Sequence, residues 1–124
     1  MTLTATVLGA PDAPALAEFY RQLLGWDIRT REPDWVTLRE PNGRAGLSFQ
    51  TETAHVRPAW PPGPGDQQMM LHLDIEVDDL TAAGVLAEFQ PQDSVRVYLD
   101  PAGHPFCLWV REDYGLVHDK TSGA

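Results

Sequence analysis

The chain has almost no cysteine, few basic residues and no long apolar run. Its single cysteine, Cys107, cannot form an internal disulfide, which favours a reducing cytoplasm. Nine Lys and Arg residues stand against eighteen Asp and Glu residues, a formal net charge of −9 at pH 7. This balance argues against nucleic acid, which requires basic patches, and favours a neutral or cationic small ligand. Without an 18-residue apolar stretch or a signal-peptide pattern, neither a membrane span nor secretion is expected.

What the chain does have is alternation. Its 124 residues are 43% hydrophobic, enough for one compact domain over 1–124 with a real core. In the stretch 69–77, apolar residues alternate with His72, Asp74 and Glu76, which predicts a strand with one face on a core. Side chains two apart on a strand lie roughly 6 to 7 Å apart, so these three form a polar row. The row lines a pocket or faces bulk solvent.

The first half of the chain reads as one strand, one helix and three further strands. Alternation predicts a strand over 2–8, and Pro11-Asp12 stops it and caps a helix. The spacing of five apolar residues predicts a buried helical stripe that Gly25 ends. Further strands are predicted over 26–30, 35–39 and 47–50. The stripe consists of Leu16, Phe19, Tyr20, Leu23 and Leu24.

After a Pro-rich connector at 57–68, the same pattern starts again. The stretches 69–77, 95–99 and 106–110 match 2–8, 35–39 and 47–50. Asp100-Pro101-Ala102-Gly103 follows Glu40-Pro41-Asn42-Gly43 by sixty positions. We therefore predict two tandem βαβββ modules, about 2–52 and 69–111, with a loose tail at 112–124. Only 78–84 is left for the second crossover, so its helix has one or two turns or that edge is distorted.

The paired modules, the Asp78-Asp79-Leu80 start and the Asp100-Pro101-Ala102-Gly103-His104-Pro105-Phe106 turn resemble the vicinal oxygen chelate superfamily. More narrowly, residues 3 to 111 resemble its glyoxalase-like and bleomycin-resistance-like members. The resemblance implies an α+β fold in which each module curls into half a barrel, forming a curved mixed sheet with helices outside. It also implies a ligand cavity on the concave face, and a homodimer, since many members pair.

In metal-using relatives, the first and last strands of each module carry His or Gln and Glu as ligands. The matching positions here are Thr6 (Ala5 in a slipped register), Ser48 (Leu47), His72 and Cys107. One imidazole and one thiol do not suit a hard catalytic metal, and three protein ligands are usual for catalytic zinc. We therefore expect no metal site and no cofactor.

Alternation and resemblance together place a set of polar and aromatic side chains on one face. That set suits an uncharged or cationic organic ligand, with the Trp109 ring available to a planar or cationic group. The face carries Thr4, Thr6, Ser48, Gln50, His72, Asp74, Glu76, Cys107 and Trp109. From it we take as candidate ligand-binding residues Thr6, Ser48, Gln50, His72, Asp74, Cys107 and Trp109.

Three functional hypotheses follow. The first is a metal-independent protein that binds a small organic ligand, in the manner of sequestering resistance proteins. The second is a lyase- or dioxygenase-type enzyme in which His72 works by acid–base chemistry or through an atypical metal, with Cys107 and Glu76 as further catalytic candidates. The third is a degenerate cavity in a protein that acts only through assembly. Whether the chain is an enzyme stays open at this point.

Overall fold

The computed structural model describes residues 1–78, 85–86 and 95–110 of the chain. The chain divides into two compact units, Met1–Val56 and Arg57–Ala124. Each unit holds one four-stranded mixed sheet, which confirms the predicted α+β class with repeated modules. In the part of the chain that is described, no helix is long and apolar enough to cross a membrane.

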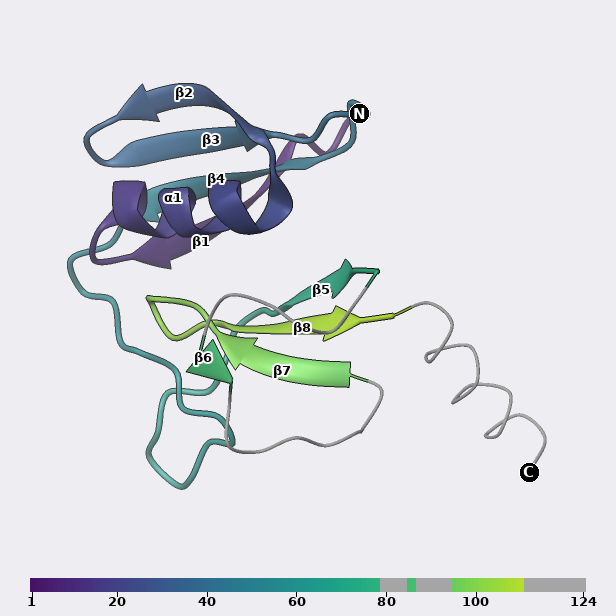
Figure 1. Ribbon diagram of the computed structural model, residues 1–124. Coiled ribbons are helices and arrows are strands. Elements are labelled where there is room, and N and C mark those ends of the chain that lie inside the picture. Colours follow the sequence, from purple (N-terminus) through teal and green to yellow (C-terminus); the bar gives the residue numbers. More distant parts are fainter. Residues whose placement is uncertain (79–84, 87–94, 111–124) are drawn as a thin grey trace. The chain divides into compact units, whose positions relative to one another are not determined.

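The first unit contains five elements in the predicted order. They are β1 (Ala5–Ala10), α1 (Ala13–Leu24), β2 (Asp27–Glu32), β3 (Trp35–Arg39) and β4 (Gly46–Thr51). The sheet order is β1-β4-β3-β2, with β1 parallel to β4 and the other neighbours antiparallel. Helix α1 lies across one face of this sheet (Figure 1) and leaves the opposite face without a helix from this unit.

Helix α1 begins and ends where the sequence predicts. Asp12 is extended, and its Oδ1 accepts a hydrogen bond from the Ala15 N–H at 3.1 Å, which satisfies one free donor of the first turn. Gly25 closes the helix by donating its N–H to the Arg21 carbonyl at 2.9 Å. Tyr20 is buried on the apolar stripe, so the helix is fixed by its caps and by one buried face.

The core of the first unit lies between α1 and the sheet. Leu8, Val36 and Phe49 occupy paired positions on β1, β3 and β4 and have no exposed surface. The Tyr20 ring stacks on Phe49 with centroids 5.7 Å apart. Burying one such side chain contributes about 1.5–3 kcal/mol, so this layer supplies much of the unit's stability.

The second unit repeats the topology of the first. It contains β5 (Leu73–Glu76), β6 (Val85–Leu86), β7 (Val95–Leu99) and β8 (Pro105–Trp109), in the order β5-β8-β7-β6 with β5 parallel to β8. Phe106 and Leu108 are completely buried, and the Tyr98 ring stacks on Phe106 at 5.5 Å. The predicted short second helix falls on 78–84, of which 79–84 lie outside the described residues, as does the predicted tail 112–124.

Strand β5 is shorter than the predicted strand 69–77. Leu73 pairs with Phe106, so the residues before Leu73 would have to pair with Pro105 and His104. Pro105 has no N–H to donate, and the His104 N–H bonds to the Asp100 carboxylate. The ladder therefore ends at Leu73, because neither Pro105 nor His104 has a free N–H group to continue it.

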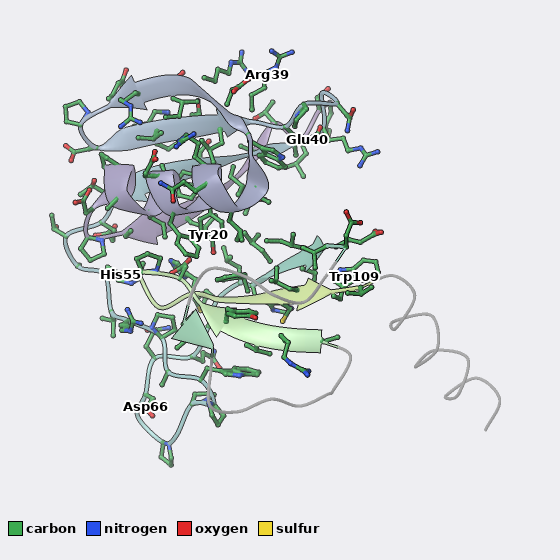
Figure 2. The ribbon with its side chains drawn as sticks, in the orientation of Figure 1. Tyr20, Arg39, Glu40, His55, Asp66 and Trp109 are labelled. Carbon is green, nitrogen blue, oxygen red and sulfur yellow. The ribbon has the colours of Figure 1, made fainter. Side chains whose placement is uncertain are left out.

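The connector 57–68 contains no helix or strand, as expected, but it is not simply extended. The Ala59 N–H donates to the Gln67 carbonyl at 2.8 Å, which closes the segment into a loop. Asp66, on one arm of this loop (Figure 2), accepts a hydrogen bond from the Gly63 N–H at 2.9 Å. Arg57 donates to the Pro101 carbonyl at 2.9 Å and so ties the start of the connector to the second unit.

The turns after β3 and β7 have the same internal structure, sixty positions apart. The Glu40 carboxylate accepts the N–H groups of Asn42 and Arg44 at 2.9 and 2.8 Å. The Asp100 carboxylate likewise accepts the N–H groups of residues 102 and 104, both at 2.9 Å. In each turn an acidic side chain holds the loop that leads into the last strand of its sheet.

Candidate functional site

A cavity of about 450 Å³ opens on the face of the first unit's sheet that points away from α1. Trp35, Thr37 and Arg39 reach this face because they alternate along β3 with the core residues. Ser48 on β4 is the register partner of Thr37 and also lines the cavity. The N-terminal segment 2–5 forms another wall, held by a 3.0 Å hydrogen bond from the Gly46 N–H to the Thr4 carbonyl.

Thr37, one of the residues that line the cavity, carries an unpaired hydroxyl group. Thr37 Oγ1 is buried and has no hydrogen-bond partner among the described residues. A buried polar group without a partner costs about 1–3 kcal/mol. A bound molecule would satisfy this hydroxyl only by displacing the atoms that cover it.

Three arginines line the same cavity. Arg39 belongs to β3, Arg44 to the turn after it, and Arg29 to β2. Arg29 is the extra residue of a β-bulge, since Ile28 pairs with Leu38 and Thr30 already pairs with Thr37. A bulge of this kind redirects a side chain, here on the strand next to the cavity.

The one acidic residue in the lining is committed to the turn. Glu40 is 9% exposed and lies at the end of β3 beside Arg39 (Figure 2). Besides the backbone N–H groups of Asn42 and Arg44, its carboxylate accepts the Asn42 side-chain amide at 3.3 Å. Glu40 therefore fixes the loop that carries Arg44.

The predicted residues of the first unit fall on different faces of its sheet. Ser48 lines the cavity, and Gln50 lies on the same face outside the lining. The prediction that Thr6 shares this face is wrong, because Thr6 pairs with Leu47 and points to the α1 side with Leu8. The β1 residue that pairs with Ser48 is Val7, which is 45% exposed.

In the second unit, the pairing of β5 with β8 places the predicted polar residues on one face. Asp74 pairs with Cys107 and Glu76 with Trp109, which lies at the end of β8 (Figure 2). His72 Nε2 lies 3.6 Å from Asp74 Oδ1, and both side chains are substantially exposed. The structure thus brings these residues together, while their roles as ligand-binding or catalytic groups stay predictions.

The Cys107 thiol is a poor nucleophile in this setting. Its partial burial, together with the charge and the hydrogen bond of Asp74, raises its pKa to about 11. A reactive cysteine requires the opposite shift, because the thiolate is the attacking species. The shift disfavours activation of Cys107 by His72, and the role of Cys107 as a nucleophile stays a prediction.

The side chains present do not fit the chelating site of metal-using relatives. In the first unit, the β1 position beside Ser48 carries Val7, which has no donor atom. In the second, His72 and Asp74 come with a thiol, a soft ligand that does not suit a hard catalytic metal. Within residues 1–78, 85–86 and 95–110, no three His, Cys, Asp or Glu side chains gather in a geometry that could hold an ion.

Comparison with known proteins identifies the family. The model of the glyoxalase-like domain matches residues 5–109, so the chain belongs to this family within the vicinal oxygen chelate superfamily. No curated protein sequence matches the chain.

Solved structures share the fold at low sequence identity. A glyoxalase/bleomycin resistance protein/dioxygenase family enzyme from Burkholderia phytofirmans PsJN is 18% identical, with a TM-score of 0.62 over 89% of this chain and 98% of that one. A possible glyoxalase from Bacillus cereus is 13% identical, with a TM-score of 0.62 over 88% and 98%. Lactoylglutathione lyase from Agrobacterium tumefaciens is 18% identical, with a TM-score of 0.58 over 92% and 96%.

Most residues of the cavity lining were not predicted from the sequence. Thr37 could have been predicted, because β3 and β4 were both predicted as strands and Thr37 pairs with the predicted residue Ser48 across them. Arg39 could then have been predicted as well, because it lies two positions after Thr37 on the same strand and so faces the same side. Arg29 depends on the bulge and Arg44 on the shape of the turn, and no periodicity reveals either.

Proposed function

We propose that this glyoxalase-like protein binds a small organic molecule in the cavity of its first unit, without a metal, and so sequesters it. The observation that carries the proposal is the cavity of about 450 Å³, whose lining includes Thr37 with its unpaired hydroxyl. Small-molecule sites are typically about 300–1,000 Å³ and carry a few well-placed polar groups. The Ser48 hydroxyl and the Trp35 ring supply a second polar group and an apolar surface.

The first test is a screen of small neutral, cationic and anionic organic compounds. Binding is measured from the rise in Tm and from shifts of the backbone amide signals of Trp35, Thr37 and Ser48 in NMR spectra of the full chain. A compound that occupies the cavity should shift these three signals together. The proposal fails if no compound in the screen shifts them.

The matched variant is Thr37→Val, which keeps the shape and removes the hydroxyl. It should stabilise the free protein by about 1 kcal/mol, because a buried unpaired group is lost, and weaken a bound compound about fivefold. Thr53→Val, an exposed threonine outside the cavity lining, is the control and should change neither quantity. Equal affinity in Thr37→Val and the unaltered chain would remove Thr37 from the site.

Acid–base catalysis is the second candidate function, favoured by the 3.6 Å approach of His72 to Asp74. A carboxylate at this distance can orient an imidazole that works as a general base. The same screen addresses it, because a bound compound that is also converted would appear as new signals over time. Conversion that disappears in His72→Ala would favour the enzyme over the binding protein.

A further inference from the structure

The charges around the cavity of the first unit are opposite to those of the chain as a whole. The chain carries a formal net charge of −9, yet three of its nine Lys and Arg residues line this one cavity. These are Arg29, Arg39 and Arg44. We propose that the ligand of this cavity carries a carboxylate or a similar anionic group, bound by these arginines; this inference rests on the proposed function.

The three guanidinium groups are available to a ligand. In the part of the chain that is described, none of them takes part in an ion pair. Glu40, the only acidic residue among the described residues of the lining, uses its oxygens on the N–H groups of the turn. Asp27 is the register partner of Arg39 but is not part of the lining, and no ion pair joins the two.

Two local features hold these side chains beside the cavity. The bulge in β2 adds Arg29 next to Thr30, which pairs with Thr37. The Glu40 carboxylate fixes the backbone of Arg44 through a 2.8 Å hydrogen bond. Guanidinium groups bind carboxylates through paired N–H donors, so an anion here would meet donors of matching geometry.

The inference changes the expected charge of the ligand. The acidic net charge alone favours a neutral or cationic molecule, whereas the local lining favours an anion, and binding depends on the local field. Because the three side chains are exposed, salt should weaken the interaction. A ligand whose anionic group contacts the arginines and whose organic part packs against Trp35 would fit the lining.

The test uses three probes of equal size and different charge: benzoate, benzamide and benzylamine. Their dissociation constants for the full chain are measured by NMR titration, from the amide signals of Thr37 and Ser48. Benzoate should bind about tenfold more tightly than benzamide, and benzylamine most weakly. Raising the salt concentration from 0.05 to 0.5 M should weaken benzoate several-fold and leave benzamide unchanged.

Arg39→Gln and Arg29→Gln should each weaken benzoate about fivefold with little effect on benzamide. Arg31→Gln is the matched control: Arg31 lies on the same strand, but it pairs with Val36 and faces the α1 side. It should leave both constants unchanged. Signal dispersion in the NMR spectra shows that each variant is folded.

The outcomes separate this inference from the proposed function. If benzamide binds as tightly as benzoate, or if a neutral compound occupies the cavity while benzoate does not, the anionic ligand is excluded and the binding function stands. If neither the probes nor any compound in the screen shifts the cavity signals, both fail.

Discussion

The two units of this chain have one topology and two different surfaces. In both units, the first strand pairs in parallel with the last strand. The strand before the last pairs with the last strand in the antiparallel direction. The matching positions carry different chemistry: Thr37 and Ser48 correspond to Val97 and Cys107, while Val7 corresponds to Asp74. The same strand order therefore carries different side-chain chemistry, and among the described residues it is the first unit that holds a polar cavity lined by three arginines.

What the units share most closely is the turn before the last strand. A carboxylate accepts two backbone N–H groups in each, and a glycine with positive φ follows, Gly43 at 78° and Gly103 at 89°. The two turns differ in burial: Asp100 is 1% exposed and Glu40 is 9% exposed. The carboxylate that accepts two backbone N–H groups should therefore contribute more stability in the second unit than in the first.

The largest expected effect comes from removing these carboxylates. Asp100→Ala should lower the free energy of unfolding by about 2–4 kcal/mol, because two N–H groups lose their acceptor in a buried turn. Glu40→Ala should cost about 1–2 kcal/mol, since water reaches its turn more easily. Denaturant unfolding of the full chain measures both values.

Asp66→Ala is the control for this pair. Its carboxylate accepts one N–H group in the exposed connector loop, so its loss should cost less than about 1 kcal/mol. If Glu40→Ala proved as costly as Asp100→Ala, burial would not distinguish the two turns, and the comparison would fail.

A smaller effect separates the two glycines. In Gly43→Ala the new methyl group meets open space, so only the positive φ opposes it, at about 1 kcal/mol. In Gly103→Ala the methyl group would collide with Arg57 Cγ, so the cost should be about 2 kcal/mol or more. Denaturant unfolding of the two variants gives the difference.

The background variant Arg57→Ala isolates the collision. In that background, Gly103→Ala should cost no more than Gly43→Ala, because the obstructing side chain is gone. An unchanged cost would show that backbone strain, and not Arg57, distinguishes the two turns.

Much of the fold could be predicted from the sequence because each signal was local. Alternation located the strands Trp35–Arg39 and Val95–Leu99, and the cap at Asp12 located α1. Alternation says which residues share a face but not which face meets the helix. Thr6 was misassigned for this reason: the apolar residues of β1 that seemed to belong to the core include the exposed Val7.

The candidate site could be predicted only in part, because its lining comes from features that are not periodic. Ser48 followed from alternation on a single strand. Arg29 requires a bulge that shifts the register by one residue, and Arg44 requires a turn built around Glu40. Net charge is a poor guide to a local site for a similar reason, because it sums over the chain while a ligand meets a few side chains.

The smallest effect concerns the position where the units differ most, Ser48 against Cys107. Partial burial and Asp74 raise the pKa of the Cys107 thiol to about 11 in the folded chain. In the unfolded chain the thiol pKa is about 8.5. Between about pH 8.5 and 11 the folded chain therefore keeps a thiol proton that the unfolded chain loses. Between these two values the unfolded state binds fewer protons, so stability should fall as pH rises. Alkylation by iodoacetamide at pH 8 should be about tenfold slower in the folded chain than in urea, since the smaller thiolate fraction outweighs its greater nucleophilicity.

Asp74→Asn should speed alkylation of the folded chain, because the negative charge that stabilises the protonated thiol is removed. Glu76→Gln is the matched control, as Glu76 lies on the same face but pairs with Trp109, and it should leave the rate unchanged. The fall in stability above pH 8.5 should also shrink in Cys107→Ala. Equal alkylation rates in the folded and unfolded chains would mean that Asp74 does not protect the thiol, and Cys107 would return as a nucleophile candidate.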